Sequence, residues 1–165
     1  DAALQAKEAG VKDCQVIRLE TYSDALKFCD RPDPESTIEA KFSLQHSVAI
    51  ALSKGWPELT DFEPNAIAKT SNLRSKIEVV EADDFDAVYP AHYGARLLID
   101  GQSFLAKDAY GDPENPLSDS ALFNKALELM MFGGMDESAA KTLIGQAAAL
   151  PIEPSLISDY TRHLP

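Results

Sequence analysis

Four runs in the first 110 residues alternate apolar and polar positions with the period of a β-strand. They cover residues 14–21, 76–82, 93–99 and 102–109. Asp100-Gly101 separates the last two runs, and this dipeptide between alternating runs is typical of a tight β-hairpin. In that hairpin we expect five apolar side chains to share one face, namely Ala95, Leu97, Ile99, Phe104 and Ala106.

Apolar residues at helical spacing occupy much of the chain between these strands. The clearest case predicts a helix over residues 44–53, where the apolar positions follow i, i+4, i+7 and i+8: Leu44, Val48, Ala51 and Leu52. Gly55 ends this helix. Asp61-Phe62-Glu63-Pro64 begins another, with Pro64 near its first turn, that runs to about Leu73. Shorter helices are expected at 1–9, closed by Gly10, and at 23–28, capped by Ser23, whereas 83–90 is expected to be an acidic loop.

The pattern changes at residues 111–116, where two prolines without N–H groups exclude both helix and strand. Beyond this run the sequence predicts only helices, from Ser118 to Phe132 and over about 136–149, with a further short one after Pro154. We therefore expect an α+β domain over residues 1–112, with a small sheet of about four strands and antiparallel character. A C-terminal helical segment over 113–165 follows, and its apolar faces require a partner surface.

Composition and charge narrow the possible functions. Fifteen Lys and Arg against 27 Asp and Glu give a formal net charge of −12, which argues against binding to nucleic acid or to an anionic membrane surface. No apolar run approaches the ~20 residues of a membrane span. A local pocket can still bind a small anion. The chain opens on Asp1 within a helical pattern, and we expect it to be a piece of a longer, cytoplasmic protein.

Candidate chemistry gathers where a loop enters the helix at residue 44. Ser43, Gln45 and His46 supply hydrogen-bond donors beside a helix N-terminus, which favours an anion. The alternative is that Ser43 only caps the helix and His46 lies on the surface. For His92, His163 and the acidic run Asp83, Asp84 and Asp86 a structural or solvated role is expected, and the spacing of Cys14, Cys29 and the histidines predicts no metal site. The sequence contains no complete catalytic set.

Several stretches together resemble the C-terminal part of the MmgE/PrpD family, in the same order and at the same separations over nearly the whole chain. The two most specific run from Glu39 to Ala49 and from Gly111 to Leu117. The others are Asp1-Ala2-Ala3-Leu4, Lys76-Ile77-Glu78-Val79 and Tyr89-Pro90.

This resemblance implies an enzyme without cofactors that moves a proton at a carbon beside a carboxylate of a small di- or tricarboxylate, as a dehydratase, decarboxylase or epimerase. It implies a lid-type α+β domain that closes over a larger all-helical domain, to which the last helices return, and a homodimer. The family's main acid and base lie largely in that helical domain, before Asp1, so this chain alone is expected to be inactive. Ser43, Gln45 and His46 are implied near the substrate, with His46 as a contact or as a support behind the contacts, and not as the base.

A second hypothesis is a free-standing α+β binding or assembly module without catalysis. In that case the terminal helices form the interface of an oligomer. The coding sequence upstream of Asp1 distinguishes the two hypotheses, because only the enzyme requires a long helical region there.

Overall fold

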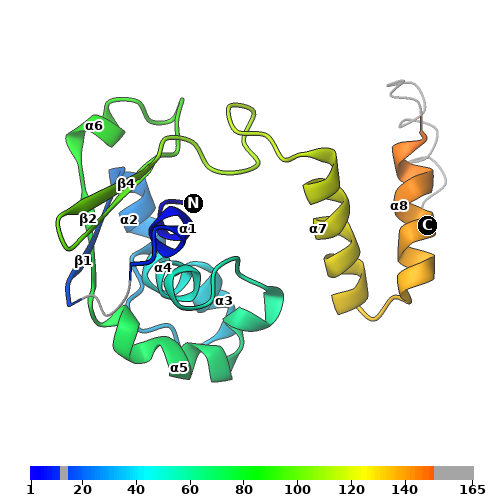
Figure 1. Ribbon diagram of the computed structural model, residues 1–165, viewed down its shortest axis with the longest axis horizontal. Helices are drawn as coiled ribbons and strands as arrows, with labels where there is room; N and C mark the ends of the chain where they lie inside the picture. Colours follow the sequence, from blue (N-terminus) through cyan, green and yellow to red (C-terminus); the bar gives the residue numbers. More distant parts are fainter. Residues whose placement is uncertain (12–14, 151–165) are drawn as a thin grey trace. The chain divides into compact units, whose positions relative to one another are not determined.

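A computed structural model describes residues 1–11 and 15–150 of the chain. The fold divides into two compact units, Asp1–Pro116 and Leu117–Pro165 (Figure 1). Three sequence-based expectations, on Cys14, on His163 and on the helix after Pro154, lie outside the described residues. Within the described ranges, no helix has the length and apolar character to cross a membrane.

The first unit contains a four-stranded sheet in the order β2-β1-β3-β4. Its strands are β1 (Ile17–Thr21), β2 (Ile77–Glu81), β3 (Ala95–Ile99) and β4 (Gln102–Ala106). The α+β class is confirmed. The expected antiparallel character holds for β1–β3 and β3–β4, but β1 and β2 run parallel, so the sheet is mixed. The parallel pairing arises because several helices carry the chain from the end of β1 back to the start of β2.

The predicted hairpin at Asp100-Gly101 is confirmed. Both residues adopt left-handed backbone angles, with φ of 49° and 78°, as a two-residue type I′ turn requires. Ile99 then pairs directly with Gln102.

The described helices of the first unit are α1 (Ala2–Glu8), α2 (Ser23–Cys29), α3 (Thr37–Lys41), α4 (Leu44–Ser53), the 3₁₀ turn η1 (Leu59–Phe62), α5 (Pro64–Arg74) and α6 (Asp83–Asp86). Helix α4 has the predicted bounds. Pro64 lies in the first turn of α5, as predicted, and is its first residue, whereas Asp61 and Phe62 belong to η1. The loop predicted for residues 83–90 is wrong at its start, because α6 forms there with Phe85 buried beneath the sheet residue Arg96.

Helix α3 and η1 were not predicted. Helix α3 begins at a side-chain cap, in which Ser36 Oγ accepts from the Glu39 N–H at 3.3 Å. The Glu39 carboxylate accepts in return from the backbone N–H of Glu35 at 2.7 Å. A serine followed three residues later by a glutamate is the sequence signal of such a start.

The core lies between the sheet and helices α1 and α4 (Figure 1). Alanines from α1 permit a close approach of that helix to the sheet, and Leu97 and Ile99 of β3 are almost completely buried beneath it. The predicted apolar stripe of α4 packs into the same core. The opposite face is charged: Arg96 pairs with Glu20 at 2.7 Å and with Asp84 at 2.9 Å.

The second unit contains α7 (Asp119–Phe132) and α8 (Glu137–Ala148) among its described residues. Ser118 caps α7 by accepting from the Ala121 N–H at 3.2 Å, as predicted. Gly134, with φ of 91°, reverses the chain between the helices. Large apolar side chains of both helices are exposed, among them Leu122, Leu129, Phe132 and Leu143.

Truncation of Leu97 to alanine tests the position of this core. Leu97 is fully buried, so Leu97→Ala is expected to lower the free energy of unfolding by about 2–5 kcal/mol. Leu105→Ala is the matched control, because Leu105 is 52% exposed and its truncation should change the stability by about 0.5 kcal/mol or less. Urea denaturation of both variants measures the difference, and equal effects would contradict the assigned core.

Candidate functional site

Ser43 caps α4 and also holds a neighbouring loop. Its Oγ accepts from the His46 N–H at 3.0 Å and donates to the Arg31 carbonyl at 2.6 Å. The side chain lies inside the domain, with 2% of the residue exposed. The capping role considered from the sequence is therefore present, together with a second bond that the sequence did not indicate.

Gln45 contacts the same loop from the first turn of α4. Its Oε1 accepts from the Arg31 N–H at 3.2 Å, and its Nε2 donates to Asp30 Oδ1 at 2.5 Å. Ser43 and Gln45 together therefore bind both backbone polar groups of Arg31.

His46 is completely buried, so the alternative that placed it on the surface is wrong. Its Nε2 lies 2.8 Å from the Asp61 carbonyl, and its Nδ1 lies 3.1 Å from Thr70 Oγ1. A carbonyl oxygen only accepts, so we assign the ring proton to Nε2. Nδ1 is then an acceptor for the Thr70 hydroxyl, whose single proton the Ala66 carbonyl at 3.0 Å also accepts. The Phe62 ring packs against the imidazole in a T-shaped arrangement, with 5.6 Å between the ring centroids.

The surroundings of His46 favour its neutral form. Burial lowers the pKa of the imidazole below its usual 6.5, and the charge of Arg74 acts in the same direction. The bond to the Asp61 carbonyl opposes this effect, but burial is the larger cause. A neutral imidazole with a hydrogen bond at each ring nitrogen is suited to holding α4, η1 and α5 together.

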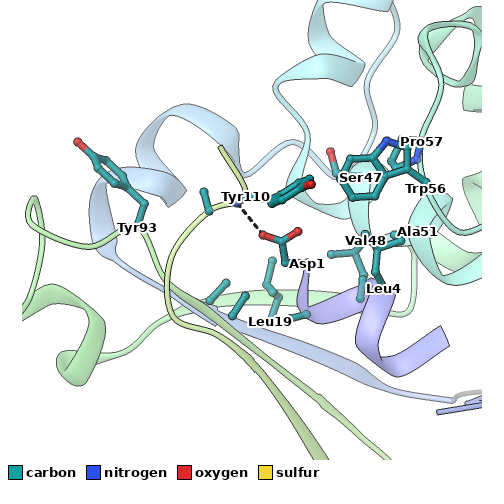
Figure 2. A pocket seen from close by; sticks show the side chains of 15 residues that line it. Asp1, Leu4, Leu19, Ser47, Val48, Ala51, Trp56, Pro57, Tyr93 and Tyr110 are labelled. Atoms are coloured by element: carbon teal, nitrogen blue, oxygen red, sulfur yellow. Dashed lines mark hydrogen bonds between the residues drawn. The ribbon is translucent and has the colours of Figure 1, made fainter. Parts of the chain in front are cut away.

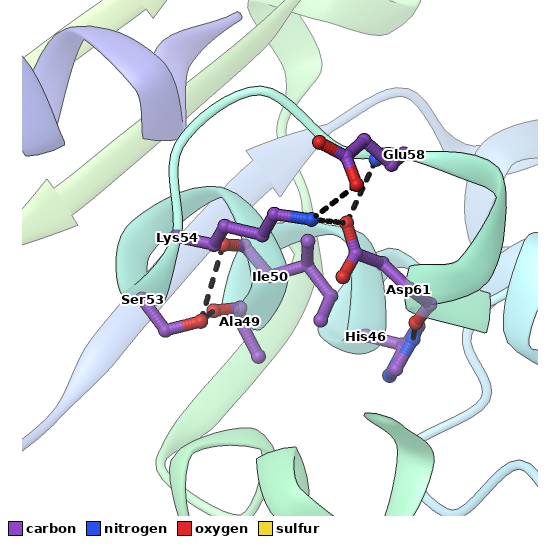
Figure 3. Close-up of polar contacts among 7 residues, drawn as sticks. All are labelled: His46, Ala49, Ile50, Ser53, Lys54, Glu58 and Asp61. Carbon is purple, nitrogen blue, oxygen red and sulfur yellow. Dashed lines mark hydrogen bonds and ion pairs between the residues drawn. The ribbon is translucent and has the colours of Figure 1, made fainter. Parts of the chain in front are cut away.

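Lys54, at the end of α4, fixes η1 from the other side of Asp61 (Figure 3). Its Nζ pairs with Asp61 Oδ2 at 2.8 Å and with Glu58 Oε2 at 2.9 Å. Asp61 Oδ2 also accepts from the Glu58 N–H at 2.7 Å. The position of the Asp61 carbonyl, which is bound to His46, is therefore fixed by these ion pairs as well as by the η1 backbone.

Arg74 completes this group of polar contacts from α5. Only 4% of the residue is exposed, and its partners are neutral oxygens: Nε donates to the Pro32 carbonyl at 2.9 Å, and Nη1 donates to Thr70 Oγ1 at 2.7 Å and to the Ile67 carbonyl. Burial lowers the pKa of the guanidinium, while the charge of Asp33 raises it. Arg74 thus brings a buried positive charge beneath the loop that Ser43 and Gln45 hold.

A cavity of about 490 Å³ lies on the other side of α4. Ser47, Val48 and Ala51 form its α4 wall, and Trp56 and Tyr93 lie toward opposite ends of it (Figure 2). The Asp1 carboxylate accepts there from the Tyr110 N–H at 2.9 Å. Among the described lining residues none has a basic side chain, so charge disfavours a polycarboxylate in this cavity.

The remaining polar residues singled out in the sequence are bound to other parts of the domain. His92 Nδ1 lies 2.5 Å from Asp108 Oδ1, and Asp86 accepts from the Ser23 N–H at 2.7 Å. Asp84 pairs with Arg96. Over residues 1–11 and 15–150 no group of three or more His, Cys, Asp or Glu side chains could hold a metal ion.

A comparison with protein-family models matches residues 1–149 to the one described as the MmgE/PrpD C-terminal domain. A search of the curated proteins finds no significant match. The matched range contains the whole network around α4 as well as the cavity.

Removal of the Ser43 hydroxyl tests its double role. Ser43→Ala removes the cap of α4 and leaves the Arg31 carbonyl without its partner, and the expected loss is about 2–4 kcal/mol in the free energy of unfolding. Ser118→Ala removes an exposed cap and a contact with the exposed Ser120 hydroxyl, and is expected to lose about 1 kcal/mol. Chemical denaturation compares the two, and similar losses would show that the bond to Arg31 contributes little.

The buried imidazole predicts a pH dependence. Because burial lowers the pKa of His46 in the folded protein, the unfolded chain binds this proton more readily. The contribution of His46 to stability is therefore complete above pH 6.5 and decreases as the pH falls toward the lower pKa of the folded state. The free energy of unfolding of His46→Gln, measured in urea at several pH values, should decrease less steeply with acid than that of the wild type. Parallel curves would contradict this prediction.

Proposed function

The chain belongs to the MmgE/PrpD family as its C-terminal domain, and we propose that it is the lid of an enzyme that acts on small di- or tricarboxylates. The reaction class is proton removal at a carbon beside a carboxylate, as in 2-methylcitrate dehydration, without a cofactor. The observation that carries this proposal is the family match over residues 1–149. The family's all-helical domain supplies the main acid and base, and a homodimer in the cytoplasm is part of the same proposal.

A lid contributes to such chemistry by excluding water and by completing the binding site. A carbon acid beside a carboxylate is activated only if the developing negative charge is stabilised, and positive charge with little water around it is most effective. The region around the N-terminus of α4 contains such a buried positive charge, because Arg74 is buried there without a carboxylate contact among the described residues.

We assign Ser43, Gln45 and His46 to this region as positioning residues behind the substrate contacts. Their polar atoms hold the Asp30–Pro32 loop, Thr70 and η1. All three are almost completely buried. We therefore expect a substitution of one of these residues to weaken substrate binding indirectly, by displacing the Asp30–Pro32 loop, and not by removing a direct contact to the substrate.

The test uses the complete gene product and a panel of small di- and tricarboxylates in deuterated water. NMR is expected to show exchange of a proton beside a carboxylate on one member of the panel. The 165-residue chain alone is the matched control and should show no exchange, because the main acid and base are absent from it.

Two outcomes would overturn parts of this proposal. Turnover of 2-methylcitrate or cis-aconitate by the isolated chain would place the acid and base within it. No exchange on any member by the folded complete protein would favour the assembly module, for which the exposed apolar side chains of α7 and α8 are the supporting observation.

A further inference from the structure

Two arginines without a carboxylate contact meet at one loop. Among the four arginines in the described residues, Arg18 and Arg96 both pair with Glu20, at 3.2 and 2.7 Å. Arg31 and Arg74 make no ion pair with any described residue, although acidic side chains far outnumber basic ones in this chain. Arg74 donates to the carbonyl of Pro32, the neighbour of Arg31.

The backbone of Arg31 is held on both sides. Its N–H donates to Gln45 Oε1 at 3.2 Å, and its carbonyl accepts from Ser43 Oγ at 2.6 Å. Pro32 restricts the next backbone angle, and its carbonyl is bound by Arg74 at 2.9 Å. Three side chains that are each 4% exposed or less therefore fix this short segment.

The Arg31 side chain itself points outward and is exposed. Its Nε donates to the Phe28 carbonyl at 3.3 Å, which limits the direction of the guanidinium. Within the described residues, its two terminal nitrogens have no hydrogen-bond partner. A guanidinium held at Nε with both terminal nitrogens free is suited to a carboxylate that accepts two parallel hydrogen bonds.

We propose that Arg31 binds a carboxylate group of the ligand and that Ser43, Gln45 and Arg74 position it for that contact. As a contact to the substrate of the enzyme, the assignment rests on the proposed function. The buried charge of Arg74 adds to the positive potential beneath the loop. Two carboxylates oppose it: Asp30, one of whose oxygens accepts from Gln45 Nε2, and Asp33, whose charge acts on Arg74.

A direct binding measurement tests the contact separately from catalysis. The probe is tricarballylate, a tricarboxylate, titrated calorimetrically into the complete gene product. Arg31→Ala is expected to weaken binding about ten- to a hundredfold, the usual effect of losing a charge-assisted hydrogen bond. Arg31→Lys, which keeps the charge but not the forked donors, should fall between this variant and the wild type.

Lys69→Ala is the matched control. Lys69 is an exposed cation on α5 with no assigned contact, and its removal changes the net charge by the same amount. Binding by this variant should equal that of the wild type. Thermal melting followed by circular dichroism establishes whether each variant folds. If Arg31→Ala does not fold, the comparison of Arg31→Lys with the wild type still tests the contact.

The outcomes separate the two proposals. Equal binding by Arg31→Ala and the wild type, or no binding of tricarballylate by the wild type, would overturn the role of Arg31. Arg31-dependent binding without proton exchange on any panel member would support the carboxylate contact while the enzymatic proposal fails. Proton exchange whose KM and kcat are unchanged in Arg31→Ala would support the enzyme and overturn the contact.

Discussion

Helix α4 is buried on nearly all sides, and the rest of the first unit is arranged to satisfy it. One side of the helix is apolar and packs on the sheet with α1, whereas Gln45 and His46 lie on another side, away from water. A buried polar group without a partner costs about 1–3 kcal/mol. In the described part of the chain no buried side-chain nitrogen or oxygen lacks a partner. The loop at Arg31, η1 and α5 supply these partners, so α4 determines where each of them lies.

This arrangement gives the two sides of α4 different chemical properties. Toward Trp56 and Tyr110 the helix borders an apolar cavity with a carboxylate at its edge. Toward α5 it borders neutral oxygens, a neutral imidazole and a buried guanidinium. Buried positive charge therefore lies on the second side, whereas no described residue lining the cavity has a basic side chain. A single helix separates the two environments, because its residues face one or the other according to their position around the helix axis.

The sequence allowed the local features of the fold to be predicted. The bounds of α4, the turn at Asp100-Gly101 and the cap at Ser118 each depend on residues within a few positions of one another. The parallel pairing of β1 with β2 was not predictable in this way, since it depends on how intervening helices pack. Helix α3 has a local signal of the same kind, because Ser36 and Glu39 form the cap at its start.

The candidate site shows the same division between local and distant causes. Ser43, Gln45 and His46 could be selected from the sequence because they begin a helix. Their burial could not be predicted from the sequence. It depends on Thr70, Asp61 and the Arg31 backbone, which the chain brings to α4 from separate segments. Arg31 gave no signal of its own, since an arginine beside a proline in a polar turn is ordinary. Only the contacts of its backbone distinguish it.

The parallel pairing of β1 and β2 also has a consequence for the order of folding. The chain leaves the sheet after Thr21 and returns beside the same strand at Ile77, so all the helices that build the polar network lie in one closed loop. The β3–β4 hairpin closes over two residues and can form early, whereas β2 can join only after that long loop has closed. Within that loop, Ser43, Gln45 and His46 bond to residues 12 to 24 positions away. These separations are short, so the polar network can form without waiting for β1 and β2 to pair.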